Sequence, residues 1–89
     1  MAGKQEDVPP IDFVTFVLSL SAQALVHLGV AVPGGPPPEV DHPLAKQTID
    51  ILGLLETKTH GNLTGEEERI LAQVLTDLRL RYVDAVKKK

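Results

Sequence analysis

The sequence has 89 residues, a formal net charge of −3, and neither cysteine nor tryptophan. This length allows one small domain, and the lack of cysteine excludes disulfides and zinc sites of the cysteine type. The acidic balance argues against nucleic-acid binding, which requires a concentrated basic face. Because Phe13, Phe16 and Tyr82 are the whole aromatic content, the core must be mainly aliphatic.

Residues 1–10 are mostly polar and end in two prolines. They contain too little apolar surface to pack, so we expect a flexible tail. No small-residue cleavage site follows the apolar stretch that comes next, which argues against a secretory signal. We therefore expect a cytoplasmic protein.

The first predicted helix covers residues 12–29. Asp12 is a favourable N-cap residue, and Gly29 is a natural stop. Most polar side chains of this segment recur at steps of four and form one narrow stripe, whose members are Thr15, Ser19, Gln23 and His27. A helix with so little polar surface must be covered on most of its sides.

Three interpretations of this apolar helix compete. A membrane span is disfavoured, because residues 13–28 make a helix of about 24 Å and a bilayer core is about 30 Å thick. A central position in a monomeric bundle would need more covering residues than the chain supplies. Packing between subunits or against another protein accounts for the excess of apolar surface. The candidate contact residues on this helix are Phe13, Phe16, Val17 and Leu20.

Residues 30–41 contain two adjacent glycines and three consecutive prolines. The prolines favour an extended conformation and the glycines supply a bend, so the segment is predicted to be a semi-rigid connector. A docking site for a proline-reading domain is the alternative.

The second predicted helix covers residues 42–60, after the cap residue Asp41 and with Pro43 in its first turn. Its predicted apolar face consists of Leu44, Ile51, Leu52 and Leu55, and Ile49 and Leu54 widen it. Gly61 is expected to end the helix, because glycine adopts the left-handed conformation without strain.

The third predicted helix covers residues 64–86 and begins with a capping box formed by Thr64 and Glu67. Its packing seam consists of Leu71, Leu75, Leu78, Tyr82 and Ala85. The short turn before it predicts an antiparallel hairpin with the second helix. The expected fold is therefore all-α, with three helices in a single domain over residues 11–86 and a basic end at 87–89.

No motif for catalysis, a cofactor or a metal ion is found in the sequence, so we predict a protein that is not an enzyme. The three histidines are too far apart for a helical metal pair. Asp50 and Arg79 are on helix faces that are expected to be exposed, and Glu66 and Glu67 complement the positive helix end. These four charged residues are added to the candidate partner-binding residues.

From residue 16 to residue 83 the chain resembles a family of short bacterial proteins catalogued as a domain of unknown function. The matching stretches are residues 16–20, 24–29, 44–50, 52–55, 58–64, 77–79 and 82–83. The resemblance implies a small helical protein of cell polarity and gliding motility. It further implies a partner of a Ras-like small GTPase of the MglA type. With a scaffold of the RomR type, such a protein acts as a guanine nucleotide exchange factor at a cell pole.

A second function class stays open on the residues alone. A self-associating helical adaptor, with no influence on nucleotide exchange, explains the apolar first helix equally well. In either case we expect a protein that binds other proteins and forms a homo-oligomer.

Overall fold

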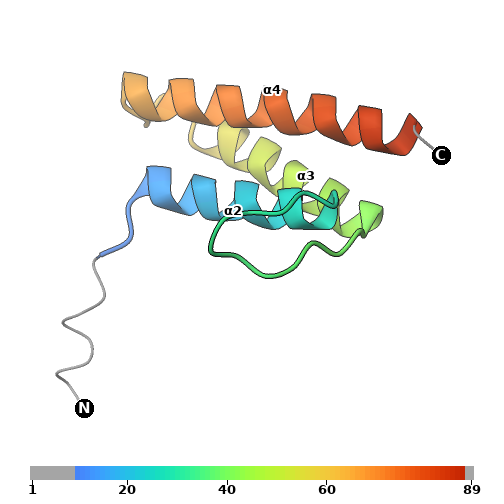
Figure 1. Ribbon diagram of the computed structural model, residues 1–89. Coiled ribbons are helices and arrows are strands. Elements are labelled where there is room, and N and C mark those ends of the chain that lie inside the picture. Colours follow the sequence, from blue (N-terminus) through green and yellow to red (C-terminus); the bar gives the residue numbers. More distant parts are fainter. Residues whose placement is uncertain (1–9, 88–89) are drawn as a thin grey trace, which may run out of the picture.

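The computed structural model describes residues 10–87, and its regular structure consists of three α-helices (Figure 1). Helix α2 spans Phe13–His27, α3 spans His42–Lys58 and α4 spans Gly65–Lys87. These limits differ from the predicted ranges by a residue or two at most ends, where helices fray. Most of the predicted tail, residues 1–9, and the last two lysines of the basic end are outside the described residues.

The helices form a small bundle. α2 and α4 run in the same direction, and α3 runs antiparallel to both, so α3 and α4 form the expected hairpin (Figure 1). Each helix contacts the other two. The all-α prediction is therefore confirmed. Within residues 10–87, no helix combines the length and the apolar character needed to cross a bilayer.

Short-range polar contacts explain where α2 and α3 begin. Oδ1 of Asp12 accepts a hydrogen bond from the Thr15 amide at 2.8 Å, and Oδ1 of Asp41 accepts one from the Leu44 amide at 3.1 Å. Each bond satisfies an amide of the first turn that has no partner inside its helix. Both predicted cap residues are therefore confirmed.

A reciprocal capping box begins α4. The Glu67 amide donates to Oγ1 of Thr64 at 3.1 Å, and the Thr64 amide donates to Oε1 of Glu67 at 2.9 Å. Asp77 and Arg81, one turn apart on the exposed side of the same helix, form an ion pair of 2.8 Å. The sequence predicted the capping box.

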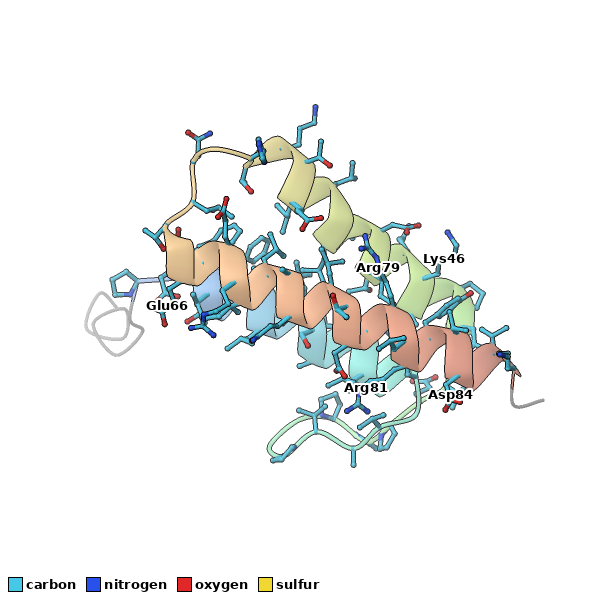
Figure 2. All side chains as sticks on the ribbon, turned by 90° about the horizontal axis from the view of Figure 1, so that it is seen from above. Lys46, Glu66, Arg79, Arg81 and Asp84 are labelled. Atoms are coloured by element: carbon cyan, nitrogen blue, oxygen red, sulfur yellow. The ribbon has the colours of Figure 1, made fainter. Side chains whose placement is uncertain are left out.

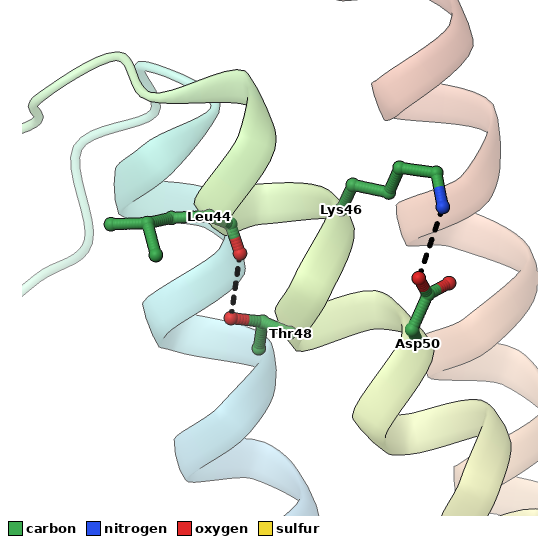
Figure 3. A network of polar contacts seen from close by, with 4 residues as sticks. All are labelled: Leu44, Lys46, Thr48 and Asp50. Atoms are coloured by element: carbon green, nitrogen blue, oxygen red, sulfur yellow. Dashed lines mark hydrogen bonds and ion pairs between the residues drawn. The ribbon is translucent and has the colours of Figure 1, made fainter.

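The core lies where the three helices meet. Its buried side chains are aliphatic and come from all of them: Val17, Ala24, Ile49, Leu52, Leu71, Leu75 and Leu78. Burial of each large aliphatic side chain stabilises the fold by about 1.5–3 kcal/mol. Thr48 is the buried polar residue of the described chain, and its hydroxyl donates to the Leu44 carbonyl at 3.0 Å (Figure 3).

The buried face of α3 includes Ile49 and Leu52 of the predicted face but is centred differently. Ala45, Ile49 and Leu52 are buried, whereas Leu44 and Ile51 are about two-fifths exposed, at 43% and 38%. The predicted face followed the bulkiest side chains. Because α3 packs against two helices at once, its buried arc is centred between them, and small Ala45 fits there.

The connector folds back onto the C-terminal end of α2. Three connector amides donate to carbonyls of the last helical turn, from Val30 to Leu25 at 2.9 Å, from Glu39 to Val26 at 3.0 Å and from Asp41 to His27 at 2.8 Å. These bonds replace the partners that a helix end lacks. The connector therefore fixes the end of α2 and the start of α3 relative to each other.

Candidate protein interface

The candidate contact residues lie in three separate regions of the bundle. Four are on α2, two are between α3 and α4, and two are at the start of α4. The structure therefore does not bring them into one site.

On α2, the four predicted residues differ sharply in exposure. Val17 is completely buried in the core, so in this fold it is not part of any surface. Phe13 and Leu20 are partly buried against the core, whereas Phe16 is 41% exposed. The difference in exposure follows from helix geometry. Val17 is two turns before buried Ala24 and lies on the same face of α2, whereas the Phe16 side chain points about 100° away from that of Val17. Of the four, Phe16 offers the most surface to a partner.

Several apolar side chains of α3 are also open to a partner. Leu44 and Thr48 are on the side of α3 that faces α2, and Lys46 and Asp50 are on the side toward α4 (Figure 3). Ile51 follows Leu44 by two helical turns and therefore lies on the same side of α3. We define the exposed apolar set of α2 and α3 as the following residues, which are 38–60% exposed: Phe16, Leu18, Leu44, Ile51 and Leu54.

Asp50 and Arg79 do come together, although they are 29 positions apart in the sequence. They line one hollow of about 150 Å³ between α3 and α4, here called the α3–α4 groove, whose residues are Lys46, Ile49, Asp50, Arg79, Tyr82 and Val83. Arg79 and Lys46 are on the same side of α4, and Arg81 and Asp84 are on the other (Figure 2). The sequence predicted each residue's exposure but not their proximity.

The charges of the groove are only partly paired. Nζ of Lys46 lies 3.0 Å from Oδ2 of Asp50 (Figure 3), and this hydrogen bond raises the pKa of Lys46. Arg79 has no hydrogen bond or ion pair with any residue that the structure describes. The groove thus carries one cation that is not neutralised.

Gly53 lies beside Arg79 of the groove, a proximity that was not predicted from the sequence. A Cβ atom at this position would lie 3.2 Å from Nη2 of Arg79. Without that atom, the guanidinium can lie against α3. A glycine inside a helix costs about 1 kcal/mol relative to alanine, and this unfavourable choice was the available signal for close packing here.

The third region is the start of α4. The carboxylate of Glu67 is engaged in the capping box, so it is already hydrogen-bonded. Glu66 is exposed at the end of α4 far from Lys46 (Figure 2). Within residues 10–87, no group of three or more histidine, aspartate or glutamate side chains is placed to hold a metal ion. Nothing in the described residues indicates catalysis.

Comparison with families of known proteins identifies the group to which this sequence is related. The model of a domain of unknown function, DUF1844, matches residues 10–84. The chain belongs to this family. Comparison with curated proteins gave no match, and comparison with solved structures gave none either.

The DUF1844 match covers α2 and α3 completely and all but the last turn of α4. The three-helix bundle is therefore the structure of the family's domain in this chain, and the exposed apolar set and the α3–α4 groove are both within it. The description of the family states no activity, so these surfaces are the structural evidence on function.

Proposed function

We propose that this DUF1844 protein is a non-catalytic protein-binding module and a regulator of a Ras-like small GTPase of the MglA type. It would act with a scaffold of the RomR type, as a component of a guanine nucleotide exchange factor at a cell pole. The sequence resembles the polarity protein RomX in length and layout, and this resemblance suggests the partners. The structural observation that supports binding is the exposed apolar set of α2 and α3.

The exposed apolar set matters because the chain is so small. Five large apolar side chains on two adjacent helices are between 38% and 60% exposed. Covering apolar surface favours association by about 25 cal/mol for each Å² removed from water, from which the entropic cost of association is subtracted. Contacts of this kind, centred on an aromatic side chain such as Phe16, provide most of the energy in many protein interfaces.

A protein that promotes nucleotide exchange needs a binding surface and no active site. A regulator accelerates exchange when it binds the nucleotide-free or GTP-bound GTPase more tightly than the GDP-bound form, because only this difference shifts the equilibrium. No catalytic group is needed. A helix pair held rigidly by a common core suits this task, because little order has to be gained on binding.

The test is the release of a fluorescent GDP analogue from the purified GTPase, with and without this protein and the scaffold. We expect the wild type to accelerate release in the presence of the scaffold. The double variant Phe16→Ser/Ile51→Ser should bind at least about fivefold more weakly, since removing a central apolar contact costs more than 1 kcal/mol. Circular dichroism verifies that each variant is helical.

Leu80→Ser is the matched control, because Leu80 is 66% exposed but lies on α4, outside the exposed apolar set. With this variant, the GTPase should release the GDP analogue as fast as it does with the wild type. Unchanged release with wild-type protein and scaffold, together with no complex on a sizing column, would contradict the proposal. Light scattering distinguishes the self-associating adaptor, which would form oligomers through the same side chains without affecting release.

A further inference from the structure

Arg79 has no hydrogen-bond or ion-pair partner among the described residues. It lines the α3–α4 groove beside Asp50, yet Asp50 pairs with Lys46 at 3.0 Å, and Arg79 pairs with no described residue. By contrast, Arg81 on the other side of α4 is neutralised by Asp77 at 2.8 Å. A guanidinium has five N–H donors in a planar fork, which suits a carboxylate.

The guanidinium of Arg79 lies close to Gly53 of the facing helix. An added Cβ there would be 3.2 Å from Nη2 of Arg79, which is tighter than an ordinary contact. No positive φ angle at Gly53 requires a glycine. The guanidinium therefore lies close to space that a side chain at residue 53 would take.

The surroundings of Arg79 combine charge with apolar surface. Arg79, Val83 and Val86 recur at steps of four and three and share one side of α4. The two valines are 52% and 38% exposed. An incoming segment can therefore cover apolar side chains and meet the cation in the same contact.

The size and charge of the groove indicate what fits it. Its volume of about 150 Å³ is below the range of roughly 300–1,000 Å³ that is typical of small-molecule sites, so it suits one or two side chains of another protein. Lys46 and Asp50 neutralise each other, which leaves one positive charge. A single carboxylate balances that charge, whereas a phosphate dianion would exceed it and face the Asp50 carboxylate.

We propose that the α3–α4 groove docks an acidic segment of a partner protein, in which one carboxylate pairs with Arg79 and a neighbouring apolar side chain covers Val83. This docking is distinct from the contacts assigned to the exposed apolar set. It does not require that the partner be a GTPase.

The test uses the full chain labelled with ¹⁵N and two synthetic alanine-rich helical peptides. One peptide carries a single glutamate with a leucine one turn away, and the other carries glutamine in place of the glutamate. We expect the glutamate peptide to shift the Arg79 Nε–Hε signal and the Gly53 amide signal saturably. The glutamine peptide should bind roughly tenfold more weakly, because the charge-assisted bidentate pair is lost.

Matched variants separate the groove from general charge effects. Arg79→Glu and Arg69→Glu change the net charge equally, but Arg69 lies outside the groove, so binding should be lost only in Arg79→Glu. Arg79→Lys keeps the charge and should still weaken binding, because the planar fork is gone. Gly53→Ala should melt at or above the wild-type temperature and yet bind more weakly, since its methyl group displaces the guanidinium.

Several results would overturn the proposal. Among them are equal binding of the two peptides, no saturable shift with the glutamate peptide, and equal losses in Arg79→Glu and Arg69→Glu. Inorganic phosphate that shifts the Arg79 signal at lower concentration than the peptide would assign the groove to a free anion instead. If the Arg79 and Gly53 signals shift with protein concentration in the absence of peptide, the groove binds a second copy of the chain instead. None of these measurements involves nucleotide release, so they stand independently of the GTPase proposal.

Discussion

Asp12 shows how one exposed side chain determines where a helix begins. Its carboxylate accepts the Thr15 amide at 2.8 Å, and this hydrogen bond lowers the pKa of Asp12 below its ordinary value of 3.8. The folded pKa is thus below the unfolded one. The charged cap therefore stabilises the fold above the unfolded pKa, and this contribution is lost as the pH falls through the folded pKa.

The substitution Asp12→Asn tests this dependence, because asparagine caps helices about as well as aspartate but does not titrate. Near neutral pH, the two proteins should have similar free energies of unfolding. As the pH is lowered past 3.8, the wild type should lose stability relative to the variant. Urea unfolding at a series of pH values measures the difference, and parallel curves for the two proteins would show that the cap carboxylate is not the cause.

Among the elements, the connector has the most demanding local geometry. Gly29 follows α2 with a φ of +87°, a conformation that L side chains rarely adopt. A Cβ atom there would also lie 3.0 Å from Cγ2 of Val40, near the end of the connector. Close approach of the two ends of the connector therefore depends on the absence of a side chain at residue 29.

Gly29→Ala is expected to destabilise the fold by at least about 1–2 kcal/mol, the typical cost of a left-handed conformation for an L residue. Gly61→Ala is the matched control, since Gly61 has a φ of +86° but no atom within 4 Å of an added Cβ. The loss in Gly29→Ala should be the greater of the two by chemical denaturation. Equal losses would mean that Val40 moves aside without cost.

At the scale of the whole molecule, stability depends on one small core shared by three helices. Leu52 is completely buried at its centre, in contact with the aliphatic side chains of α2 and α4. A small domain of this kind has a net stability of only several kcal/mol. The three helices are therefore expected to unfold together.

The substitution Leu52→Ala should cost about 2–5 kcal/mol, because it leaves a cavity that the surrounding helices cannot fill. Leu54→Ala, two residues along the same helix, should change stability by no more than about 0.5 kcal/mol, since Leu54 is 60% exposed. Thermal unfolding followed by circular dichroism measures both. A cost for Leu54→Ala that approaches that of Leu52→Ala would place α3 differently in the bundle.

Local interactions made much of this fold predictable. The caps at Asp12, Asp41 and Thr64 depend on residues within one turn, so the sequence indicated where each helix begins. The seam of α4 was predicted for the same reason, and Leu71, Leu75 and Leu78 are buried as its spacing required. The candidate site was predicted less well, because Val17 is in the core and Glu67 is committed to its own helix cap.

By itself, the sequence determined the number of helices, their approximate limits and their caps, because hydrogen bonds and side-chain periodicity act over three to seven residues. The tertiary structure decided which arc of α3 faces inward and which charges meet across α3 and α4. Those outcomes depend on how three helices share one core, and they place Arg79 against Gly53 although the two are far apart in the chain. Periodicity within one helix carries no information about the side chains of its neighbour.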